Sequence, residues 1–291
     1  MNYLHFFYKL LYKSRKLYPA KLYLKLQFQC LIHYRVNLKS PKTFNEKLLW
    51  LKLYDRNPLY TILADKYLVK KYVSDIIGDE FVVPNYGVWD NFDDINFDNL
   101  PNEFVLKTTH DSSGVIICKD KKLFDLSKVK IKLNNSLKMN YYWPEREWPY
   151  KNIRPRIIAD KFLDSHNGTP LLDYKFWCFN GRPTYMYCTV KDKEVFENFY
   201  DMDFNPVNIN HGFPRRNPEF NKPVNFDVMK ELAERLSTDI PFVRIDFFNV
   251  DGRVYFGEFT FYDWGGVKPF ANYDIDLDIG SLISLPVNKI S

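Results

Sequence analysis

The stretch RIDFFNVDGRVYFGEFTF, residues 244–261, has the pattern of a β-hairpin with an acidic residue inside each strand. Two aromatic-rich runs flank the pair Asp251-Gly252, which favours a tight turn. Asp246 lies in the first run and Glu258 in the second. Because carboxylates are poor β-formers and costly to bury, two of them in one hairpin indicate a role beyond packing.

The register of this hairpin decides whether the two carboxylates face each other. A three-residue loop, residues 251–253, pairs Val250 with Val254 and places Asp246 directly opposite Glu258. A two-residue loop would shift the register by one and place the acids on opposite faces. We therefore predict the three-residue loop, which separates a chemical face from a core face. The chemical face would carry Arg244, Asp246, Glu258 and Thr260, and the core face Val243, Ile245, Phe247, Tyr255, Gly257, Phe259 and Phe261.

Two opposed carboxylates repel each other unless a positive charge lies between them. Arg244 can supply that charge, and the group would then be a structural ion-pair ladder. A bound divalent cation is the alternative, since Mg²⁺ in proteins commonly takes one or two carboxylates and completes its shell with water and substrate phosphates. This second interpretation predicts a nucleotide, and therefore a site for phosphates and a base elsewhere in the chain.

The chain of 291 residues is long enough for one large domain or two interlocked subdomains with an ample core. Apolar residues make up 46% and aromatic residues 18%, which excludes a disordered chain. We find no apolar run long enough to span a bilayer and no signal peptide, so we expect a cytoplasmic protein. The cysteines lack metal-ligand spacing, which predicts reduced, buried thiols and no structural zinc; they are Cys30, Cys118, Cys178 and Cys188.

The positive charge of the chain is concentrated at its N-terminus. Residues 1–45 contain nine of the 41 basic residues and no acidic residue, so the remaining chain, with 36 acidic residues, is net negative. Aromatic residues and leucines lie between these basic residues. This mixture of basic and apolar residues is consistent with two interpretations. The segment is either a helical pair packed on the body, or residues 1–40 make peripheral contact with an anionic membrane or polymer. No RNA-binding motif is present, and no nucleic-acid partner is expected.

The order of predicted elements indicates an α+β protein. Residues 2–17 and 19–35 have helical patterns interrupted at Pro19, and Thr43 with Glu46 has the spacing of a capping box. Hairpins and further helices follow. Antiparallel strands separated by helices predict two lobes, with a nucleotide between them.

One further hairpin combines a strand lysine with a polar loop. FVLKTTHDSSGVIICKD, residues 104–120, places Lys107 on a mostly apolar strand beside a loop over residues 110–114. The small residues of this loop let backbone N–H groups approach phosphate oxygens. A lysine at a strand end also commonly extends to water, so both interpretations stay open at this point.

Another hairpin, DYKFWCFNGRPTYMYCTV, residues 173–190, has the strongest turn signal in the chain. Asn180-Gly181 predicts a type I′ turn. Pairing about this turn places Lys175 opposite Met186 and Asp173 opposite Cys188.

In this order, the segments resemble the TupA-like ATP-grasp family, named for teichuronopeptide synthesis. The similar stretches are KTFNEKLLWLKLYDRNPLY, ADKYLVKKYV, FVLKTTHDSSGVI, IIADKFL, DYKFWCFNG and VRIDFFNVDGRVYFGEFTFYDWGG, over roughly residues 42–290. The resemblance implies an α+β ATP-grasp fold, in which two lobes of antiparallel sheet and helices hold a nucleotide between them. We expect basic aromatic helices over 1–41, a helical cap segment over 42–100, a small lobe over 101–155 and a large lobe over 156–291.

The resemblance implies which residues hold ATP. Lys107 matches the small-lobe lysine that contacts the phosphates, and Asp160 would face the adenine amino group. The backbone of Lys161 and Leu163 would read the adenine edge. The loop that matches the mobile lid over the phosphates contains His110, Ser112, Ser113 and Gly114.

The resemblance also implies the metal site and the reaction. Asp246 and Glu258 match the two ligands of Mg²⁺, and Thr260 stands where many ATP-grasp enzymes have asparagine. Arg244 and Lys175 would neutralise the γ-phosphate or an acyl phosphate. The implied enzyme is an ATP-dependent carboxylate–amine ligase, with ATP and Mg²⁺ as cofactors, acting on a uronic acid of a surface saccharide and on an amino acid or other amine.

Three alternatives to the ligase stay open. An ATP-grasp phosphotransferase would leave phosphate on a sugar hydroxyl, and a non-catalytic protein would keep the fold only. A glycosyltransferase would need a DxD pair on a parallel-sheet lobe. DMD at 201–203 resembles such a pair but has no buried strand before it.

Overall fold

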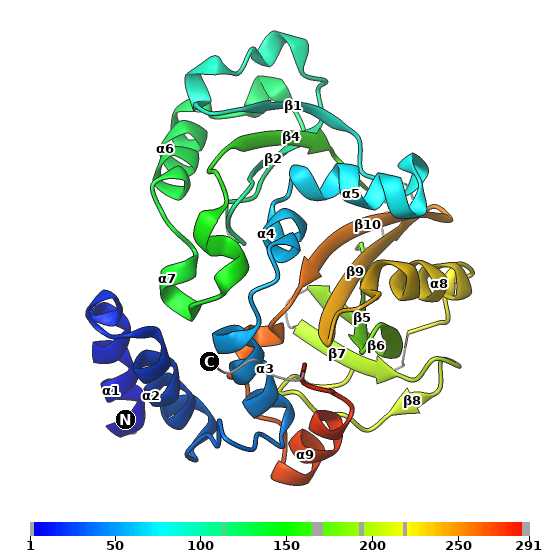
Figure 1. The fold of residues 1–291 in the computed structure, drawn as a ribbon. Helices are drawn as coiled ribbons and strands as arrows, with labels where there is room; N and C mark the ends of the chain where they lie inside the picture. Colours follow the sequence, from blue (N-terminus) through cyan, green and yellow to red (C-terminus); the bar gives the residue numbers. More distant parts are fainter. Residues whose placement is uncertain (1–2, 113, 165–170, 192–194, 218–219, 287–291) are drawn as a thin grey trace.

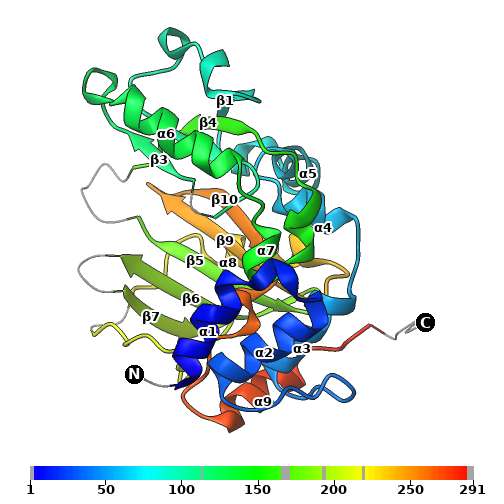
Figure 2. The ribbon, with the colours of Figure 1, turned by 90° about the vertical axis from the view of Figure 1, so that its left-hand side faces the viewer.

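A computed structural model describes residues 3–112, 114–164, 171–191, 195–217 and 220–286 of the protein (Figure 1). Two antiparallel sheets form two lobes, with helices packed on and between them (Figures 1 and 2). This architecture confirms the predicted α+β class.

The small lobe is built on a four-stranded sheet with the order β1-β4-β2-β3. Its core includes Leu106 of the sheet and Leu133 of the helix α6, both fully buried. The sheet takes β1 and β4 from outside the expected range 101–155, because β4 pairs with β1 on one side and with β2 on the other. The elements are β1 (Asn85–Trp89), β2 (Phe104–Thr108), β3 (Ile116–Cys118), α6 (Leu126–Leu137), α7 (Tyr142–Glu145) and β4 (Ile157–Lys161).

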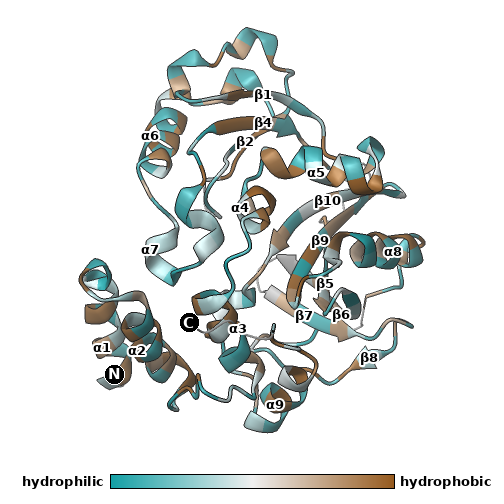
Figure 3. Ribbon diagram, viewed as in Figure 1, coloured by the Kyte–Doolittle hydropathy of each residue, from teal (hydrophilic) through white to brown (hydrophobic). Residues whose placement is uncertain are grey.

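The large lobe is built on a six-stranded sheet with the order β10-β9-β5-β6-β7-β8. The helix α8 packs on one face of the sheet, where Phe226 contacts Phe176. Figure 3 shows that α8 has both hydrophobic and hydrophilic residues, as a helix with one buried side requires. The elements are β5 (Asp173–Phe179), β6 (Arg182–Lys191), β7 (Val195–Tyr200), β8 (Pro206–Val207), α8 (Phe226–Ser237), β9 (Phe242–Val250), β10 (Arg253–Thr260) and α9 (Tyr273–Ser281).

Helices between residues 44 and 77 connect the N-terminal region to both lobes. The predicted capping box begins α3 (Phe44–Tyr54), with the Thr43 side chain accepting from the Glu46 N–H and the Glu46 side chain accepting from the Thr43 N–H. Phe44 then stacks on Trp177 of the large sheet, with ring centroids 5.1 Å apart. The helices α4 (Leu59–Ala64) and α5 (Leu68–Ile77) follow and lie between the two sheets (Figure 1).

The N-terminal helices α1 (Tyr3–Lys13) and α2 (Ala20–Ile32) are separated near Pro19, as predicted. Tyr23 and Phe28 are fully buried in a cluster that includes Leu49 of α3, so α2 packs on the body through its aromatic residues. Helix α1 instead leaves large apolar side chains exposed. Among the described residues, no helix is long and apolar enough to cross a membrane.

Short 3₁₀ helices and buried thiols complete the description. The 3₁₀ helices are η1 (Arg15–Leu17), η2 (Asp79–Phe81), η3 (Phe92–Asp94), η4 (Phe97–Asn99), η5 (Lys121–Leu123), η6 (Trp148–Asn152) and η7 (Asp263–Gly266). All four cysteines are free and buried, which confirms the prediction of reduced thiols.

The hairpin of β9 and β10 corrects the predicted loop but keeps the predicted pairing of the acids. The loop has two residues, Asp251 and Gly252, with φ of 51° and 80°, and Val250 pairs with Arg253. A β-bulge at Gly257 then shifts the register by one, so Asp246 still pairs with Glu258. Glycine suits this position because a Cβ there would lie 3.0 Å from the backbone oxygen of Asp246.

The bulge also reverses the predicted faces of the β10 residues that lie between the bulge and the turn. Tyr255 pairs with Phe248, on the side of Asp246, and not on the predicted core face. Phe256 pairs with Phe247 instead, and both belong to the main core cluster.

The hairpin of β5 and β6 has the predicted turn but a different register. Asn180 and Gly181 both have positive φ, 50° and 80°, as a type I′ turn requires. Cys178 pairs with Pro183 and Trp177 with Tyr185, so one residue of β6 is left without a partner beside a proline that has no N–H for the ladder. Beyond this bulge the predicted pairing is wrong by one residue: the partner of Lys175 is Tyr187 rather than Met186, and that of Asp173 is Thr189 rather than Cys188.

Candidate active site

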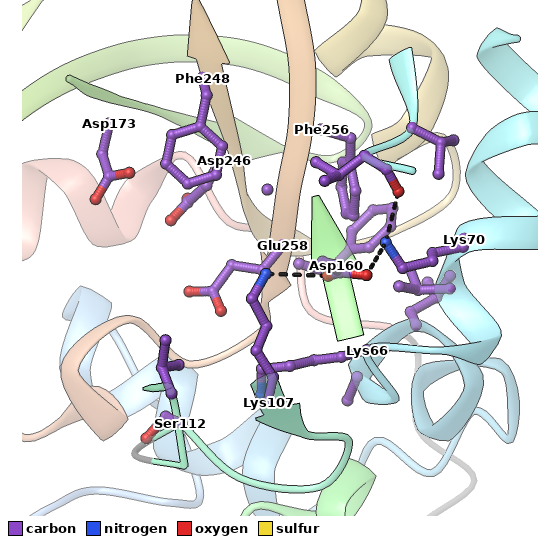
Figure 4. A pocket seen from close by; sticks show the side chains of 18 of the residues that line it. Lys66, Lys70, Lys107, Ser112, Asp160, Asp173, Asp246, Phe248, Phe256 and Glu258 are labelled. Carbon is purple, nitrogen blue, oxygen red and sulfur yellow. Dashed lines mark hydrogen bonds and ion pairs between the residues drawn. The ribbon is translucent and has the colours of Figure 1, made fainter. Parts of the chain in front are cut away.

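A cavity of about 330 Å³ lies between the two lobes and brings together six of the predicted site residues, which are Lys107, Ser112, Asp160, Lys175, Asp246 and Glu258 (Figure 4). The small lobe contributes Lys107 and Asp160, the turn between α4 and α5 contributes Lys66, and α5 contributes Lys70. The large sheet contributes Asp173, Lys175, Asp246, Phe248, Phe256 and Glu258. Acidic and basic side chains from both lobes therefore face one enclosed space of a size that suits a small-molecule site.

The large-lobe wall of this cavity is a row of charged residues that runs across the sheet. Glu258 on β10 pairs with Asp246 on β9, and Asp246 pairs with Lys175 on β5. Directly paired residues of antiparallel strands share a face. The row therefore presents two carboxylates and an ammonium group to the small lobe.

Asp246 is the most buried of these acids and is fully paired. It is 3% exposed, and its carboxylate accepts from Arg244 Nε at 2.7 Å, from Arg244 Nη2 at 2.8 Å and from Lys175 Nζ at 2.7 Å. Burial alone would raise the pKa of Asp246, but the charges of Arg244 and Lys175 outweigh it and lower that pKa below its ordinary value. The carboxylate is therefore ionised at neutral pH.

Arg244 lies between the two opposed carboxylates, as the ion-pair interpretation requires. Its Nη2 also donates to Glu258 Oε1 at 3.0 Å, and its Nη1 donates to Asp263. Glu258 is more accessible, with 45% of its side chain exposed, and accepts from the Thr260 hydroxyl at 3.2 Å. Arg244 and Thr260 are not among the residues that line the cavity.

The same residues also fit a magnesium ion. They supply two carboxylates and a hydroxyl, which are the hard oxygen donors that Mg²⁺ prefers. Asp246 and Glu258 face the cavity side by side, and the repulsion between them is offset by a cation. In the part of the chain that the structure describes, no group of three or more His, Cys, Asp or Glu residues could hold a metal. Water and phosphate oxygens would therefore have to complete the shell.

The small-lobe wall is built around Asp160, which joins two lysines. Lys107 Nζ donates to Asp160 Oδ2 at 3.1 Å, and Lys70 Nζ lies 3.0 Å from Oδ1 (Figure 4). Although burial opposes it, these two lysines lower the pKa of Asp160 below its ordinary value. Asp160 thus holds the ammonium groups of Lys107 and Lys70 at the cavity wall.

Lys66 and Lys70 are cavity residues that the sequence analysis did not single out. Burial lowers the pKa of both lysines. Lys66 Nζ donates to the backbone oxygen of Asp111, at the start of the predicted phosphate loop. Their spacing of four residues in ADKYLVKK was the available signal, although Lys66 lies in the turn just before α5 and only Lys70 is in the helix.

The predicted phosphate loop divides into residues inside and outside the cavity lining. Ser112 lines the cavity, and Ser113 lies outside the described residues. His110 is 2% exposed, and its Nε2 lies 2.9 Å from the backbone oxygen of Met139, in the small lobe. Gly114 packs so closely that a Cβ would lie 2.2 Å from the Thr108 hydroxyl.

Two residues whose backbone was predicted to contact adenine, Lys161 and Leu163, already make contacts within the protein. The Lys161 N–H donates to the Pro84 oxygen at 2.8 Å, and the Lys161 side chain is exposed. Leu163 packs in a small cluster with Val83 and Tyr255. The apolar part of the cavity is formed by Val69, Val82, Val83, Phe248 and Phe256.

Comparison with known structures gives distant similarity. D-alanine–D-alanine ligase from Helicobacter pylori has 16% sequence identity and a TM-score of 0.45, over 84% of this chain and 69% of that one. The same type of ligase from Bacillus anthracis, solved with ATP, has 14% identity and a TM-score of 0.40, over 68% of this chain. This chain spans only 53% of the length of the Bacillus anthracis ligase.

A RimK domain ATP-grasp protein from Sphaerobacter thermophilus has 12% identity and a TM-score of 0.43, over 79% of this chain and 70% of that one. No curated protein matches the sequence.

The family is shown by a sequence match that covers most of the chain. Residues 46–284 match the family model described as TupA-like ATPgrasp. This confirms the predicted family. The protein therefore belongs to the TupA-like ATP-grasp family.

Proposed function

We propose that the protein is an ATP- and Mg²⁺-dependent ligase that joins the carboxylate of a uronic acid, in a surface saccharide or its precursor, to an amino acid or other amine. The observation that carries this proposal is the cavity in which the opposed carboxylates of Asp246 and Glu258 face Lys107 of the other lobe. The TupA-like family assignment supports the saccharide acceptor.

In the first step, an oxygen of the substrate carboxylate attacks the γ-phosphorus of ATP. The bond between this phosphorus and the β–γ bridging oxygen breaks, and ADP leaves with the electron pair. Asp246 and Glu258 would hold Mg²⁺, which when bound would supply Lewis-acid chemistry and neutralise phosphate charge. Lys107 and Lys70, oriented by Asp160, supply positive charge from the other wall of the cavity.

In the second step, the neutral amine nitrogen attacks the carbonyl carbon of the acyl phosphate. The bond between this carbon and the phosphate oxygen breaks, inorganic phosphate leaves, and the nitrogen loses one proton to form the amide. Lys175 lines the cavity and is the cation placed to stabilise the leaving phosphate, while Arg244, held at the same Asp246 carboxylate outside the lining, adds positive charge from behind it. No protein nucleophile takes part in either step.

The geometry favours this ligase over a glycosyltransferase. Every strand pair among the described residues is antiparallel, whereas a nucleotide-sugar lobe needs a parallel sheet. The DMD motif forms a turn in which the Asp201 carboxylate accepts from the N–H groups of Asp203 at 2.9 Å and Asn205 at 2.8 Å. Its acids do not line the cavity.

Measuring ATP turnover with a panel of uronic acids and amines tests the proposal. We expect ADP and an amide from the wild type, and a loss of about a hundredfold or more in turnover for Glu258→Gln with unchanged circular dichroism. Glu231→Gln, on the exposed side of α8, is the matched control. A phosphorylated sugar as the product would favour the phosphotransferase instead, and a Glu258→Gln variant that works at the wild-type rate would remove the metal assignment.

We also propose that helix α1 holds the enzyme at an anionic membrane surface, where a lipid-linked acceptor would be found. Tyr3 is 91% exposed, Phe6 52% and Leu10 50%, while Lys9 and Lys13 lie on the same helix. Exposed apolar residues beside lysines, in a segment with no acidic residue before Glu46, suit the interface of an anionic bilayer.

Point variants test this contact better than truncation, since removing residues 1–40 would also remove buried Phe28. Full-length Phe6→Ser/Leu10→Ser is expected to bind phosphatidylserine vesicles at least tenfold more weakly than the wild type. Neutral phosphatidylcholine vesicles serve as the control for charge. Equal binding of the double variant and the wild type would exclude α1 as the contact.

A further inference from the structure

The turn that follows β10 carries a large aromatic residue in an uncommon backbone conformation. Trp264 has φ of 46° and ψ of 33°, in the left-handed region, and is 47% exposed. Bulky residues rarely adopt this conformation, and those that do are concentrated at active sites and ligand-binding turns. Packing of the core does not account for Trp264, because nearly half of the residue is exposed.

Helix α3 holds this turn in place from the buried side. Lys52 Nζ on α3 donates to the backbone oxygen of Gly265 at 2.5 Å. Gly266 packs so closely on the same helix that a Cβ would lie 2.9 Å from Leu48 Cβ. A residue on a fixed turn has little conformational freedom to lose when it binds a ligand. Trp264 is therefore presented to solvent in a preorganised position.

An ammonium group lies against the exposed ring. Lys268 Nζ is 4.0 Å from the ring centroid of Trp264 and 3.2 Å from that of Phe213. The lysine stem packs over Gly212, where a Cβ would lie 2.9 Å from Lys268 Cε. Among the described residues, Lys268 Nζ forms neither a hydrogen bond nor an ion pair. The two rings attract the cation, but its N–H donors are left for an anionic oxygen.

Positive charge near this ammonium group lies at the surface, and negative charge lies beneath it. Arg216, in the loop that carries Phe213, is exposed. The acids whose charge acts on Lys268 are Glu197 and Asp263, and both are buried. An anionic ligand that approaches from solvent would therefore meet the cations first.

The register of the large sheet places this cluster on the side of the reaction cavity. Asp173, which lines the cavity, pairs with Thr189 on β6, and Thr189 pairs with Glu197 on β7. Paired residues share a face. Because Glu197 is one of the acids that act on Lys268, the cluster lies over the same face.

The cluster also adjoins the row of carboxylates. Asp263 and Glu258 both accept hydrogen bonds from Arg244, Asp263 from Nη1 and Glu258 from Nη2. Trp264 follows Asp263 directly in the chain and does not line the cavity. It therefore lies just outside the reaction site, where a substrate larger than one sugar unit would extend.

We propose that Trp264, Phe213 and Lys268 form a subsite for an acidic sugar unit next to the reacting uronic acid of the acceptor. The exposed face of Trp264 would pack against the C–H groups of a pyranose ring, since these hydrogens are positive and the aromatic face is negative. Lys268, held by Phe213, would pair with the carboxylate of that unit. The inference rests on the proposed ligase function and narrows its acceptor to an oligosaccharide with at least two uronate units.

Isothermal titration calorimetry with the full-length protein, without ATP, tests the inference. The probes are the trimers of galacturonate and of glucuronate, each compared with its monomer. We expect the wild type to bind one of the trimers at least tenfold more tightly than its monomer, and Trp264→Ala to lose most of this preference. Tyr273→Ala, which removes an aromatic residue that is 51% exposed on α9, is the matched control. No preference for either trimer in the wild type, or an equal preference in Trp264→Ala, would overturn the inference.

A second variant separates the charge from the aromatic contact. Lys268→Met keeps the apolar stem, and we expect it to bind the acidic trimer at least tenfold more weakly but the methyl-esterified trimer as the wild type does. Trp264→Ala should weaken both. Lys71→Met, at a lysine whose side chain is 83% exposed, is the matched control. Circular dichroism checks folding, and Trp264→Phe, which restores an aromatic face, should regain part of the trimer preference. Equal affinity of Lys268→Met and the wild type for the acidic trimer would overturn the role of Lys268.

Product analysis separates this inference from the proposed function. With ATP and an amine present, we expect Trp264→Ala to raise the KM for the trimer at least tenfold while the KM for ATP stays the same. Trimer binding that depends on Trp264 and Lys268, without amide formation by the wild type, would refute the ligase function and leave the subsite standing. Amide formation with a trimer KM that neither variant changes would refute the subsite alone.

Discussion

Two groups of buried charges on one face of the large sheet differ in how they are paired. Around Asp246, two cations and a carboxylate satisfy one another with distances of 2.7 to 2.8 Å. At Glu197, two strands away from β5, a carboxylate is equally buried and unpaired among the described residues. The first arrangement maintains the fold, since removing one member would leave the others unbalanced. The second is costly to ionise, because burial raises the pKa of Glu197 to about 8.

Breaking the paired group is expected to have the largest effect on stability. Asp246→Asn keeps the side-chain volume but leaves the buried charges of Arg244 and Lys175 with fewer partners. We expect the free energy of unfolding to fall by about 3 kcal/mol in urea denaturation followed by circular dichroism. A change below about 1 kcal/mol would mean that Asp263 and Asp173 compensate, and that the pairing around Asp246 is not structural.

Removing the charge of Glu197 is expected to raise the free energy of unfolding, and to do so only at high pH. Because the pKa of this carboxyl is raised to about 8 in the folded chain, unfolding releases its proton, and wild-type stability falls as the pH rises from the ordinary value of 4.5 to about 8. Glu197→Gln lacks this loss. We expect it to match the wild type at about pH 5 and to be more stable by about 2 kcal/mol at about pH 9.

Thermal unfolding of both proteins across this pH range measures the difference, and Glu231→Gln controls for the loss of one negative charge. A Glu197→Gln variant that is less stable than the wild type at high pH would show that the carboxylate has a partner in the folded protein.

The bulge next to the paired group predicts a smaller effect. Gly257→Ala adds a methyl group 3.0 Å from the Asp246 backbone oxygen, so the strand pair has to separate slightly. We expect a loss of about 1 kcal/mol of stability and weaker ATP binding, because Asp246 and Glu258 would no longer face each other squarely. Gly252→Ala tests the turn instead, where a Cβ would meet nothing within 4 Å and the positive φ alone opposes the substitution. Unchanged ATP affinity in Gly257→Ala would separate the bulge from the site.

The smallest effect is expected at an exposed ion pair that resembles the buried group only in its chemistry. Lys71 and Asp75 lie 2.8 Å apart on α5, with side chains 83% and 57% exposed. We expect Lys71→Ala to change stability by less than about 0.5 kcal/mol. A loss as large as that of Asp246→Asn would show that burial does not explain the difference between the two kinds of pair.

Local patterns predicted the elements well, and long-range register less well. Thr43 and Glu46 form their capping box, and Asn180-Gly181 forms its turn, because both depend on neighbouring residues only. The pairing of Lys175 was wrong because a bulge beside Pro183 shifts one strand, and the residue pattern shows this only once both strands are placed.

The candidate site shows the same limit. The opposed position of Asp246 and Glu258 followed from period and turn, although the predicted loop was wrong by one residue and the bulge restored the pairing. Lys66, Lys70 and Glu197 were missed because their importance comes from burial and from neighbours distant in sequence. Two lysines four residues apart, or a strand with one glutamate, look ordinary until the lobes are assembled.

The bulge at Gly257 has a consequence for reading related sequences. A two-residue tip followed by one extra residue on the return strand gives the same acid pairing as a three-residue tip without it. A one-residue gap that moves between residues 251 and 257 in an alignment therefore leaves the two carboxylates in phase. An uncompensated insertion or deletion in the same segment would turn one of them to the opposite face of the sheet.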